Sequence, residues 1–366
     1  MFLYQKIYQV LKDDIQKNVY SCGTFLPTEA SMAEKYGVDR TTIRKAIDLL
    51  MEEKMVERHA SKGTLVIYNG KSDRDQPVWN SEESQNRDKK NIAFLLPRGE
   101  DNSDRITIPF YAQLFYEVER YSKELGFSVI YSTMDEMDDL LEMFGNTLDR
   151  LAGIIFVSNI AEKHITNALR LGIPAVLVNG YSSKLPSIAS DNRRGTYLAC
   201  ENLIQLGHKK IGILDGISQY ASAHARLEGV LRCFRDYKLE FNSEFLISNN
   251  GWEYKDGYEA MKTFLEKNTE LPSAFICFND RLAGGAIEAI HEKGLKIPED
   301  LSLVGYDNAE ICNFLNPKLS SVETYVPSIA DHAIEALYYQ MISKRLSPAK
   351  ILIPVEYVER ESVRRI

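Results

Sequence analysis

The sequence predicts an α/β protein in which an N-terminal winged helix-turn-helix precedes a larger, doubly wound α/β domain. Three observations predict this fold class. The first 69 residues combine three amphipathic helical segments with two short β-rich segments. Residues 70–90 are polar and poor in aliphatic side chains, which predicts a flexible linker. From residue 91 onward, continuous apolar runs alternate with helical segments, a pattern typical of parallel sheets covered by helices on both faces.

The N-terminal segments follow the order of a winged helix. Apolar residues at helical spacing in residues 4–15 predict a first helix. Thr28 is a suitable N-cap for a second helix, which ends at Gly37. After a third helix, the β-rich segments 55–58 and 64–68 flank a tight turn and predict a hairpin.

The third helix, residues 38–50, carries the strongest pattern. Its apolar residues fall three and four apart, and Asp39 can cap its first turn. Arg40 and Arg44 lie four residues apart and project from the same side of the helix. Such a helix suits the DNA major groove, where Arg binds guanine with two hydrogen bonds. A solvated cationic face on an ordinary helix has the same pattern. The apolar positions are Ile43, Ala46, Ile47 and Leu50, and the polar ones are Arg40, Thr41, Arg44 and Lys45.

The N-terminal part also resembles a known family. The motifs LPTE, YGVDRTTIRKA and a GT wing, in this order, are similar to the GntR-type winged helix. This resemblance implies that Arg40, Thr42 and Arg44 contact bases, and that Thr28, Thr41 and Lys45 hold phosphates. It places His59, Lys62 and Gly63 in the wing, and we add Glu29, in the first turn of the second helix, to the DNA-binding set. The sequence departs from the family pattern at Asp39, where Ser is usual, and at Ser61, where a wing glycine is usual.

Net charge bears on DNA binding. The chain of 366 residues has a net charge of −8, but residues 1–70 carry ten Lys or Arg against nine Asp or Glu. The acidic surplus therefore lies in the C-terminal part. Because a surplus of one positive charge is small for a DNA-binding domain, we expect salt-sensitive binding by a homodimer to a near-palindromic double-stranded operator.

The C-terminal part predicts seven buried strands with helices between them. Polar residues in the loops that follow such strands are candidates for a binding site, because ligands bind beyond the C-terminal ends of parallel strands. The strand-like runs are residues 92–97, 128–133, 153–158, 175–180, 210–216, 274–279 and 302–308. The clearest helical segments are residues 110–125, 196–206, 256–266 and 281–292.

The candidate ligand residues suit a carbohydrate. Sugar hydroxyls need planar donors and acceptors, and the C–H face of a sugar packs on aromatic rings. The polar candidates are Arg226, Asn279, Asp280 and Asp307, and the aromatic ones are Phe110, Tyr111 and Trp252. Five of them have a structural alternative: helix capping or loop closure for the two aspartates, a surface charge for Arg226, and ordinary core packing for Phe110 and Trp252.

A second resemblance covers residues 91–366. The segments ASDNRRGTYLACENLIQLGHKKIGILDG, ARLEGV and PSAFICFNDRLAGGAIEAIHEKGLKIPEDLSLVGYDN are similar to the sensor domain of LacI-type repressors. This resemblance implies a periplasmic-binding-protein-like domain of two lobes with crossings near Ser190, Ser321 and Ser347. Lobe one would hold about 91–190 and 322–346, and lobe two about 191–321 and 347–366. It makes Arg226 and Asp307 the main ligand residues and Phe110, Tyr111 and Trp252 the aromatic walls. Further ligand positions are Asp191, Tyr220 and Ser222.

The two resemblances together predict a regulator. A GntR-type winged helix on a LacI-type sensor is similar to the arabinose repressor (AraR) group, and implies a transcription repressor controlled by a small effector, with a sugar such as a pentose as the expected ligand. Two rivals are a solute-binding protein, either exported to serve a transporter or cytoplasmic, and an enzyme. A corepressor-dependent regulator with a non-sugar effector is a further alternative.

Several classes of protein do not fit the sequence. Lys6, Lys12 and Asp13 interrupt the N-terminus, so we expect no signal peptide, no membrane span and a cytoplasmic protein. The five cysteines form no CxxC pair, and the six histidines share no motif with a nucleophile. No Gly-rich nucleotide loop occurs. We therefore expect no cofactor, no metal site and no catalytic residues.

Overall fold

The computed structural model describes residues 3–17, 19–20, 23–53, 55–59, 63–68, 89–99, 103–343 and 348–366. Two compact units make up the chain, residues 1–84 and 85–366. Most of the predicted linker, including Trp79, lies outside the described residues, as do Cys22, Ser61 and Lys62.

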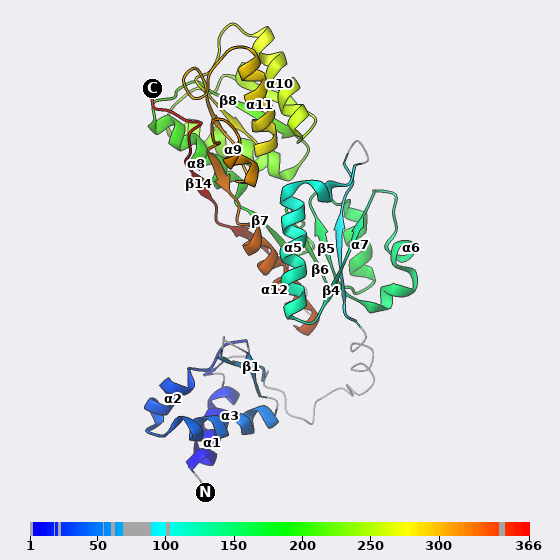
Figure 1. The fold of residues 1–366 in the computed structure, drawn as a ribbon. Coiled ribbons are helices and arrows are strands. Elements are labelled where there is room, and N and C mark those ends of the chain that lie inside the picture. Colours follow the sequence, from blue (N-terminus) through cyan, green and yellow to red (C-terminus); the bar gives the residue numbers. More distant parts are fainter. Residues whose placement is uncertain are drawn as a thin grey trace. The chain divides into compact units, whose positions relative to one another are not determined.

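The first unit is the predicted winged helix (Figure 1). Its helices are α1 (Leu3–Gln16), α2 (Glu29–Tyr36) and α3 (Arg40–Glu52), and its strands are β1 (Val56–His59) and β2 (Gly63–Val66). The two strands pair antiparallel, as the hairpin prediction requires. The four apolar residues of the third helix are fully buried, which confirms the face predicted from their spacing.

Both predicted caps form. The Thr28 hydroxyl accepts a hydrogen bond from the Ser31 N–H at 3.2 Å, and Gly37 ends α2 in the left-handed conformation at φ 64°. At α3, the Asp39 carboxylate accepts from the Thr42 N–H at 2.8 Å. Hydrogen bonds from Thr41 and Thr42 lower the Asp39 pKa to about 2. Asp39, the departure from the usual Ser, therefore acts as an ionised N-cap.

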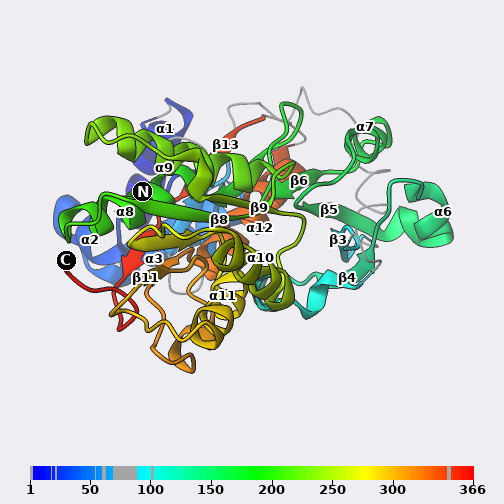
Figure 2. The same ribbon diagram turned by 90° about the horizontal axis from the view of Figure 1, so that it is seen from above.

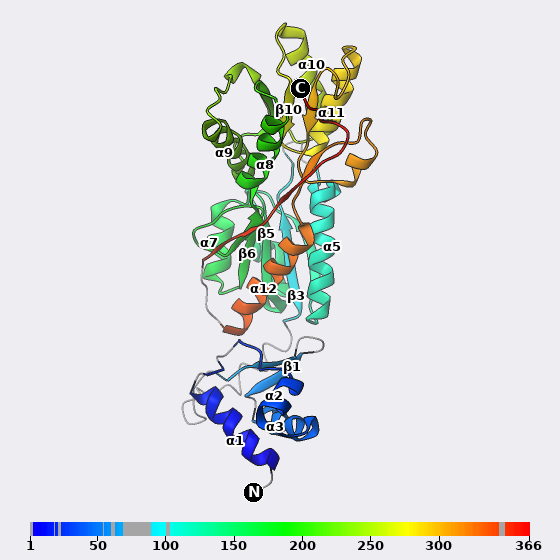
Figure 3. The same cartoon turned by 90° about the vertical axis from the view of Figure 1, so that its left-hand side faces the viewer.

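In the second unit, lobe one is built on a six-stranded parallel sheet in the order β13-β7-β6-β5-β3-β4. Helices α5 and α12 pack on one face with a common core, and α6 and α7 cover the other face. Figures 1 and 3 show α12 beside α5. The strands are β3 (Asn91–Leu96), β4 (Ser128–Thr133), β5 (Leu151–Val157), β6 (Ala175–Val178), β7 (Ser187–Ser190) and β13 (Lys350–Ile353). The helices are η1 (Arg105–Thr107), α5 (Pro109–Glu124), α6 (Leu140–Phe144), η2 (Gly145–Arg150), α7 (Glu162–Arg170) and α12 (Val326–Ser343).

Lobe two repeats this design on a four-stranded parallel sheet in the order β11-β10-β8-β9. Helices α8 and α9 cover one face, and α10 and α11 cover the other (Figure 2). The strands are β8 (Ile211–Ile217), β9 (Leu246–Asn249), β10 (Ala274–Cys277) and β11 (Ser302–Val304). The helices are α8 (Asn192–Gln205), α9 (Ala221–Asp236), η3 (Ser243–Phe245), α10 (Tyr254–Lys267), α11 (Asp280–Glu292) and η4 (Glu310–Asn313). Each of the seven predicted apolar runs contains a strand, which confirms the doubly wound α/β fold.

The crossings between the lobes differ from the prediction at one point. Strand β12 (Ser321–Glu323) pairs antiparallel with β14 (Glu356–Val358) where two chain segments pass between the lobes. The predicted third crossing, Ser347, lies outside the described residues. Residues 350–353 were assigned to lobe two, but β13 hydrogen-bonds with β7 in the sheet of lobe one. The crossing therefore follows Ile353, because pairing with a distant strand decides the position of this short segment.

Among the residues that the structure describes, no helix combines the length and apolar character needed to cross a membrane.

A close approach of α8 and α9 holds one face of lobe two together. A Cβ atom on Gly229 of α9 would lie 2.2 Å from the Arg193 carbonyl oxygen and 2.2 Å from the Thr196 hydroxyl of α8. We predict that Gly229→Ala lowers the free energy of unfolding by about 1–3 kcal/mol, because the helices must separate. Urea denaturation measures the change.

Arg232→Ala is the matched control on the same helix, since the Arg232 side chain is 61% exposed. It should change stability by less than about 0.5 kcal/mol. If Gly229→Ala is as stable as the wild type, the contact between α8 and α9 does not restrain the lobe.

Candidate functional site

The candidate DNA-binding surface lies on α3, where Arg40, Thr41, Arg44 and Lys45 are exposed and Thr42 is half-buried. The hydroxyls of Thr41 and Thr42 both donate to the Asp39 carboxylate. Their predicted contacts with phosphate and base therefore require these bonds to be shared or exchanged. In the hairpin, His59 is half-buried and its ring packs edge to face with that of Phe25, 6.1 Å away, and Gly63 is exposed at φ 110°.

Arg44 is held by Glu29 from the neighbouring helix. Arg44 Nη2 lies 2.8 Å from Glu29 Oε2, and Arg58 of β1 lies 3.6 Å from the other Glu29 oxygen. Arg58 also pairs with Asp48 of α3 at 2.9 Å. The hydrogen bond from Arg44 lowers the Glu29 pKa. Since Arg44 remains 57% exposed, this network orients its guanidinium while leaving it accessible.

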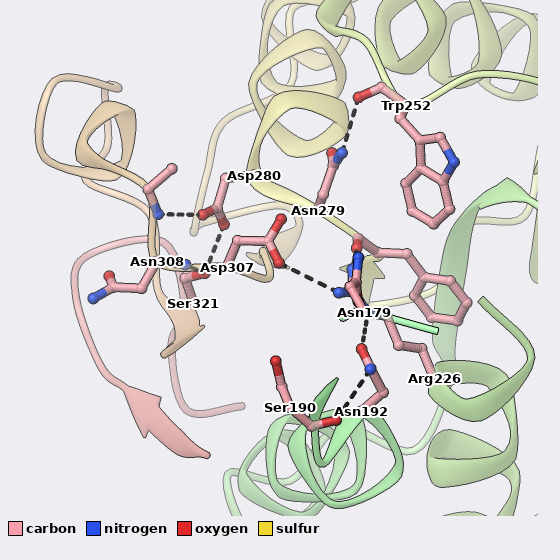
Figure 4. Close-up of polar contacts among 12 residues, drawn as sticks. Asn179, Ser190, Asn192, Arg226, Trp252, Asn279, Asp280, Asp307, Asn308 and Ser321 are labelled. Carbon is pink, nitrogen blue, oxygen red and sulfur yellow. Dashed lines mark hydrogen bonds and ion pairs between the residues drawn. The ribbon is translucent and has the colours of Figure 1, made fainter. Parts of the chain in front are cut away.

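In the second unit, Arg226 is the centre of a buried polar cluster. Its side chain is 8% exposed. Arg226 Nε donates to Asn192 Oδ1 at 2.7 Å, Nη1 donates to the Phe278 carbonyl, and Nη2 lies 3.3 Å from Asp307 Oδ1 (Figure 4). Its guanidinium also stacks 3.7 Å from the Tyr306 ring centroid. The alternative of a surface charge is therefore wrong for Arg226.

Asp307 follows the last strand of the lobe-two sheet in an unusual backbone conformation, with φ 98°. Its backbone N–H donates to the Val322 carbonyl at 3.0 Å, which attaches this turn to a crossing segment. Burial raises the Asp307 pKa to about 6, although Arg226 opposes the shift. The carboxylate and the guanidinium together present acceptors and donors in one place.

Asn279 and Asp280 make structural bonds at the start of α11. Asn279 caps that helix by accepting from the Leu282 N–H at 2.7 Å, and its amide donates to the Trp252 carbonyl at 2.9 Å. Asp280 accepts from the Ser321 hydroxyl at 2.6 Å and from the Ala309 N–H at 2.7 Å. These bonds match the alternative of capping and loop closure.

The aromatic candidates lie in two groups. In lobe two, the rings of Tyr220 and Trp252 are 6.1 Å apart, and Trp252 is 5.9 Å from the Arg226 guanidinium. In lobe one, Phe110 and Tyr111 pack edge to face at 5.2 Å. The Tyr111 hydroxyl lies 2.9 Å from Ser158 Oγ.

Two grooves contain residues of both lobes. One joins Phe110 and Gln113 to Asn279 and Asp307. The other joins Asn179 and Tyr181 to Asp191, Asn192 and Ser222. Asp191 also caps α8 by accepting from the Arg194 N–H at 3.0 Å. Six of the predicted effector residues therefore line these two grooves: Phe110, Asn279, Asp280 and Asp307 in the first, and Asp191 and Ser222 in the second. The other four, Tyr111, Tyr220, Arg226 and Trp252, line neither groove.

Four residues of this region were missed by the sequence analysis. Ser158 is the last residue of one predicted apolar run and Asn179 the second-last residue of another, and their φ values are positive, at 61° and 54°. Asn192 follows Asp191 directly. Arg105 is buried, although it stands in a polar stretch. The positions of Ser158 and Asn179 at strand ends could have identified them, whereas nothing in the local sequence indicates that Arg105 is buried.

Within the described part of the chain, no three His, Cys, Asp or Glu side chains gather in a way that could hold a metal ion. The four cysteines described are buried and free.

Comparisons with known proteins agree with this architecture. Residues 3–66 match the bacterial regulatory proteins of the gntR family, and residues 200–363 match the periplasmic binding protein-like domain. The HTH-type transcriptional repressor PurR of Pasteurella multocida is 32% identical over 267 residues, covering 70% of this chain and 78% of that repressor. The ribose operon repressor of Haemophilus influenzae is 27% identical over 259 residues, covering 70% of this chain and 77% of that one. A crystal structure of a LacI family transcriptional regulator from Enterococcus faecium with bound ribose has a TM-score of 0.66 at 24% identity, over 76% of this chain and 100% of that one.

A winged helix combined with a two-lobed binding domain defines a ligand-regulated transcription factor. The chain belongs to the LacI-type family of transcription repressors and carries a gntR-type winged helix as its DNA-binding domain. It is a DNA-binding repressor regulated by a small molecule, and its relatives are transcriptional regulators rather than enzymes. The family assignment thus identifies a transcription regulator and not an enzyme, the second rival interpretation.

Buried Asp280 predicts a pH dependence of stability. Burial is the main cause that raises the Asp280 pKa from 3.8 to about 7, and the negative charge of Asp307 is the second. The folded state therefore holds a proton that the unfolded state releases at lower pH, so this group makes the protein less stable as pH rises from about 4 to 7. We predict that Asp280→Asn flattens this decline, measured by urea denaturation at pH 5, 6, 7 and 8.

Glu299→Gln, at an exposed position, is the control and should keep the wild-type slope. An unchanged slope in Asp280→Asn would mean that Asp280 stays ionised throughout this range.

Proposed function

We propose that the repressor is controlled by a sugar bound between its two lobes, and that it binds a near-palindromic operator as a homodimer in the cytoplasm. The main support for a sugar ligand is the Arg226–Asp307 pair, which lies beside the aromatic ring of Trp252. Guanidinium N–H groups and a carboxylate match the donors and acceptors of neighbouring sugar hydroxyls, while the indole face matches the C–H face of the sugar.

The comparisons support a sugar as the ligand class. One relative is a ribose operon repressor, and one structural neighbour was solved with bound ribose. A pentose is therefore the first ligand to test.

Lobe closure is the proposed means of control. The lobes are joined by crossing segments that include β12 and β14, so a ligand that touches both lobes favours the closed arrangement. In the inducer scheme, closure disfavours the spacing of the two winged helices that operator binding needs. In the corepressor scheme, closure favours that spacing. Either coupling is reciprocal, so operator DNA must change sugar affinity by the same factor as sugar changes operator affinity.

Two observations support a homodimer. A winged helix with a charge surplus of one gains salt-sensitive affinity when two copies bind together. The second unit also exposes large apolar side chains, among them Phe314 at 77%, Ile342 at 64% and Tyr116 at 62%. Exposed apolar side chains of this size suit an interface with a second copy.

The proposed base contact of Arg44 is directly testable. We predict that Arg44→Ala lowers specific operator affinity by about tenfold or more, as for a lost base contact, with no change in sugar binding. Fluorescence anisotropy on labelled operator measures the affinity. Lys35→Ala, which removes an exposed charge from the end of α2, is the control for loss of charge alone. Equal effects of the two substitutions would contradict a specific role for Arg44.

The sugar proposal is tested by ligand-induced stabilisation. Thermal unfolding is measured with ribose, arabinose, xylose, glucose and galactose, on the wild type and on Asp307→Asn. A sugar at 100 times its Kd stabilises the wild type by about 2.7 kcal/mol, and the same sugar shifts operator affinity. Asp307→Asn should bind the operator as the wild type does without sugar, and should lose both responses.

The exposed Asp300→Asn is the matched control and should respond as the wild type. An unchanged sugar response in Asp307→Asn would place the effector elsewhere. The panel is extended with the phosphate esters and carboxylates of these sugars. If none of the neutral or acidic sugars stabilises a protein that still binds its operator, the effector is not a sugar.

A further inference from the structure

Arg105 is a buried cation where the two lobes meet. Its residue is only 6% exposed. The guanidinium carbon lies 4.7 Å from the ring centroid of Tyr111, in α5 of lobe one, and 5.4 Å from that of Tyr220, which precedes α9 in lobe two. A side chain of lobe one thus contacts an aromatic ring of each lobe.

The hydrogen bonds of Arg105 lead into the ligand region. Nη2 donates to the Tyr111 hydroxyl, and Nη1 donates to the Tyr220 hydroxyl at 3.4 Å. The Tyr111 hydroxyl also forms a hydrogen bond with Ser158 Oγ at 2.9 Å, and the Asn179 amide donates to the same oxygen at 3.3 Å. Ser158 and Asn179 directly follow β5 and β6, at the strand ends where ligands bind in parallel sheets.

Within the described residues, the hydrogen-bond partners of Arg105 carry no charge. In the described ranges, no carboxylate oxygen comes within 4.0 Å of its guanidinium, and both hydrogen-bond partners are neutral tyrosine hydroxyls. The adjacent Asp104 is engaged elsewhere, because its carboxylate accepts from the Ile106 N–H and from the Tyr131 hydroxyl. Arg226, by contrast, faces Asp307. A buried guanidinium without a counter-ion favours an anionic partner.

Arg105 and Arg226 lie at the two ends of a row of aromatic rings. Arg105 stacks near Tyr220, Tyr220 is 6.1 Å from Trp252, and Trp252 is 5.9 Å from Arg226. A ligand that lies along this row meets the neutral pair Arg226–Asp307 at one end. At the other end it meets the guanidinium of Arg105, which no carboxylate of the described residues neutralises. This arrangement suits a molecule with a neutral, hydroxyl-rich part and one acidic group.

We propose that Arg105 binds an anionic group of the effector, so that the ligand is an acidic sugar: a phosphate ester or a sugar carboxylate. This inference rests on the proposed sugar effector and narrows it. A guanidinium forms two parallel hydrogen bonds with either phosphate or carboxylate, which a neutral hydroxyl does not match. Closure of the lobes around such a ligand would bring its charge against Arg105 and its ring against Trp252.

Matched ligand pairs test the proposal. Isothermal titration compares ribose with ribose 5-phosphate, glucose with glucose 6-phosphate, and glucose with glucuronate, on the wild type, Arg105→Gln and Arg105→Lys. We expect one acidic member to bind at least about tenfold more tightly than its neutral parent. Arg105→Gln should remove this preference with less than about a twofold change for the parent, and Arg105→Lys should keep part of it. The phosphate and carboxylate pairs distinguish the two kinds of acid.

Arg98→Gln is the matched control, because Arg98 is an exposed lobe-one arginine paired with Asp135. It should leave every affinity unchanged. The preference of the wild type for the acidic member should also fall as salt is raised, a readout that does not depend on how well a variant folds.

Two results would overturn the inference while leaving the sugar effector in place. The first is equal or tighter binding of the neutral parents by the wild type. The second is an equal loss of neutral and acidic ligands in Arg105→Gln, which would make Arg105 a contact between the lobes only. Failure of every neutral and acidic sugar to bind would instead overturn the proposed effector class, and this inference with it.

Discussion

The buried guanidinium of Arg226 is the constraint on which the candidate ligand site depends. Its bonds reach the start of α8 through Asn192, the chain after β10 through the Phe278 carbonyl, and the turn after β11 through Asp307. A charge that is 8% exposed must keep these partners, since losing one leaves a buried donor unpaired. The loops of lobe two that form the proposed ligand site are therefore fixed by the protein's own hydrogen bonds.

Asp280 connects this fixed half to the segments that join the lobes. Its two oxygens accept from Ala309, in the loop after β11, and from Ser321, at the start of β12. Asp307 approaches the same segment through its backbone bond to Val322. The turn after β11 and strand β12 are thus held by two acidic residues, Asp280 and Asp307, whose pKa values are both raised. If ligand binding shifts the turn at Asp307, these hydrogen bonds would transmit the shift directly to strand β12 between the lobes.

The sequence predicted what local patterns determine. The buried face of α3, the caps at Thr28 and Asp39, and a strand in each of the seven apolar runs all follow from spacing or from one side chain. Pairing between distant segments was not predictable. Strand β13, for example, pairs with β7, although the two are separated by more than a hundred and fifty residues of the chain. The burial of Arg226 and Arg105 was also hidden, because their partners Asp307 and Tyr220 stand 81 and 115 residues further along the chain.

The two functional surfaces use the same chemistry in opposite environments. Arg44 pairs with Glu29 at 2.8 Å, but the arginine is 57% exposed, so water and salt screen the pair. Such a pair exchanges its partner for a base or a phosphate at little cost, which suits a surface that must bind and release DNA. Arg226 and Asp307 have no such substitute in the buried region between the lobes. A ligand there would have to supply matching groups. We therefore expect the region between the lobes to select its ligand strictly, and the winged helix to bind and release DNA readily.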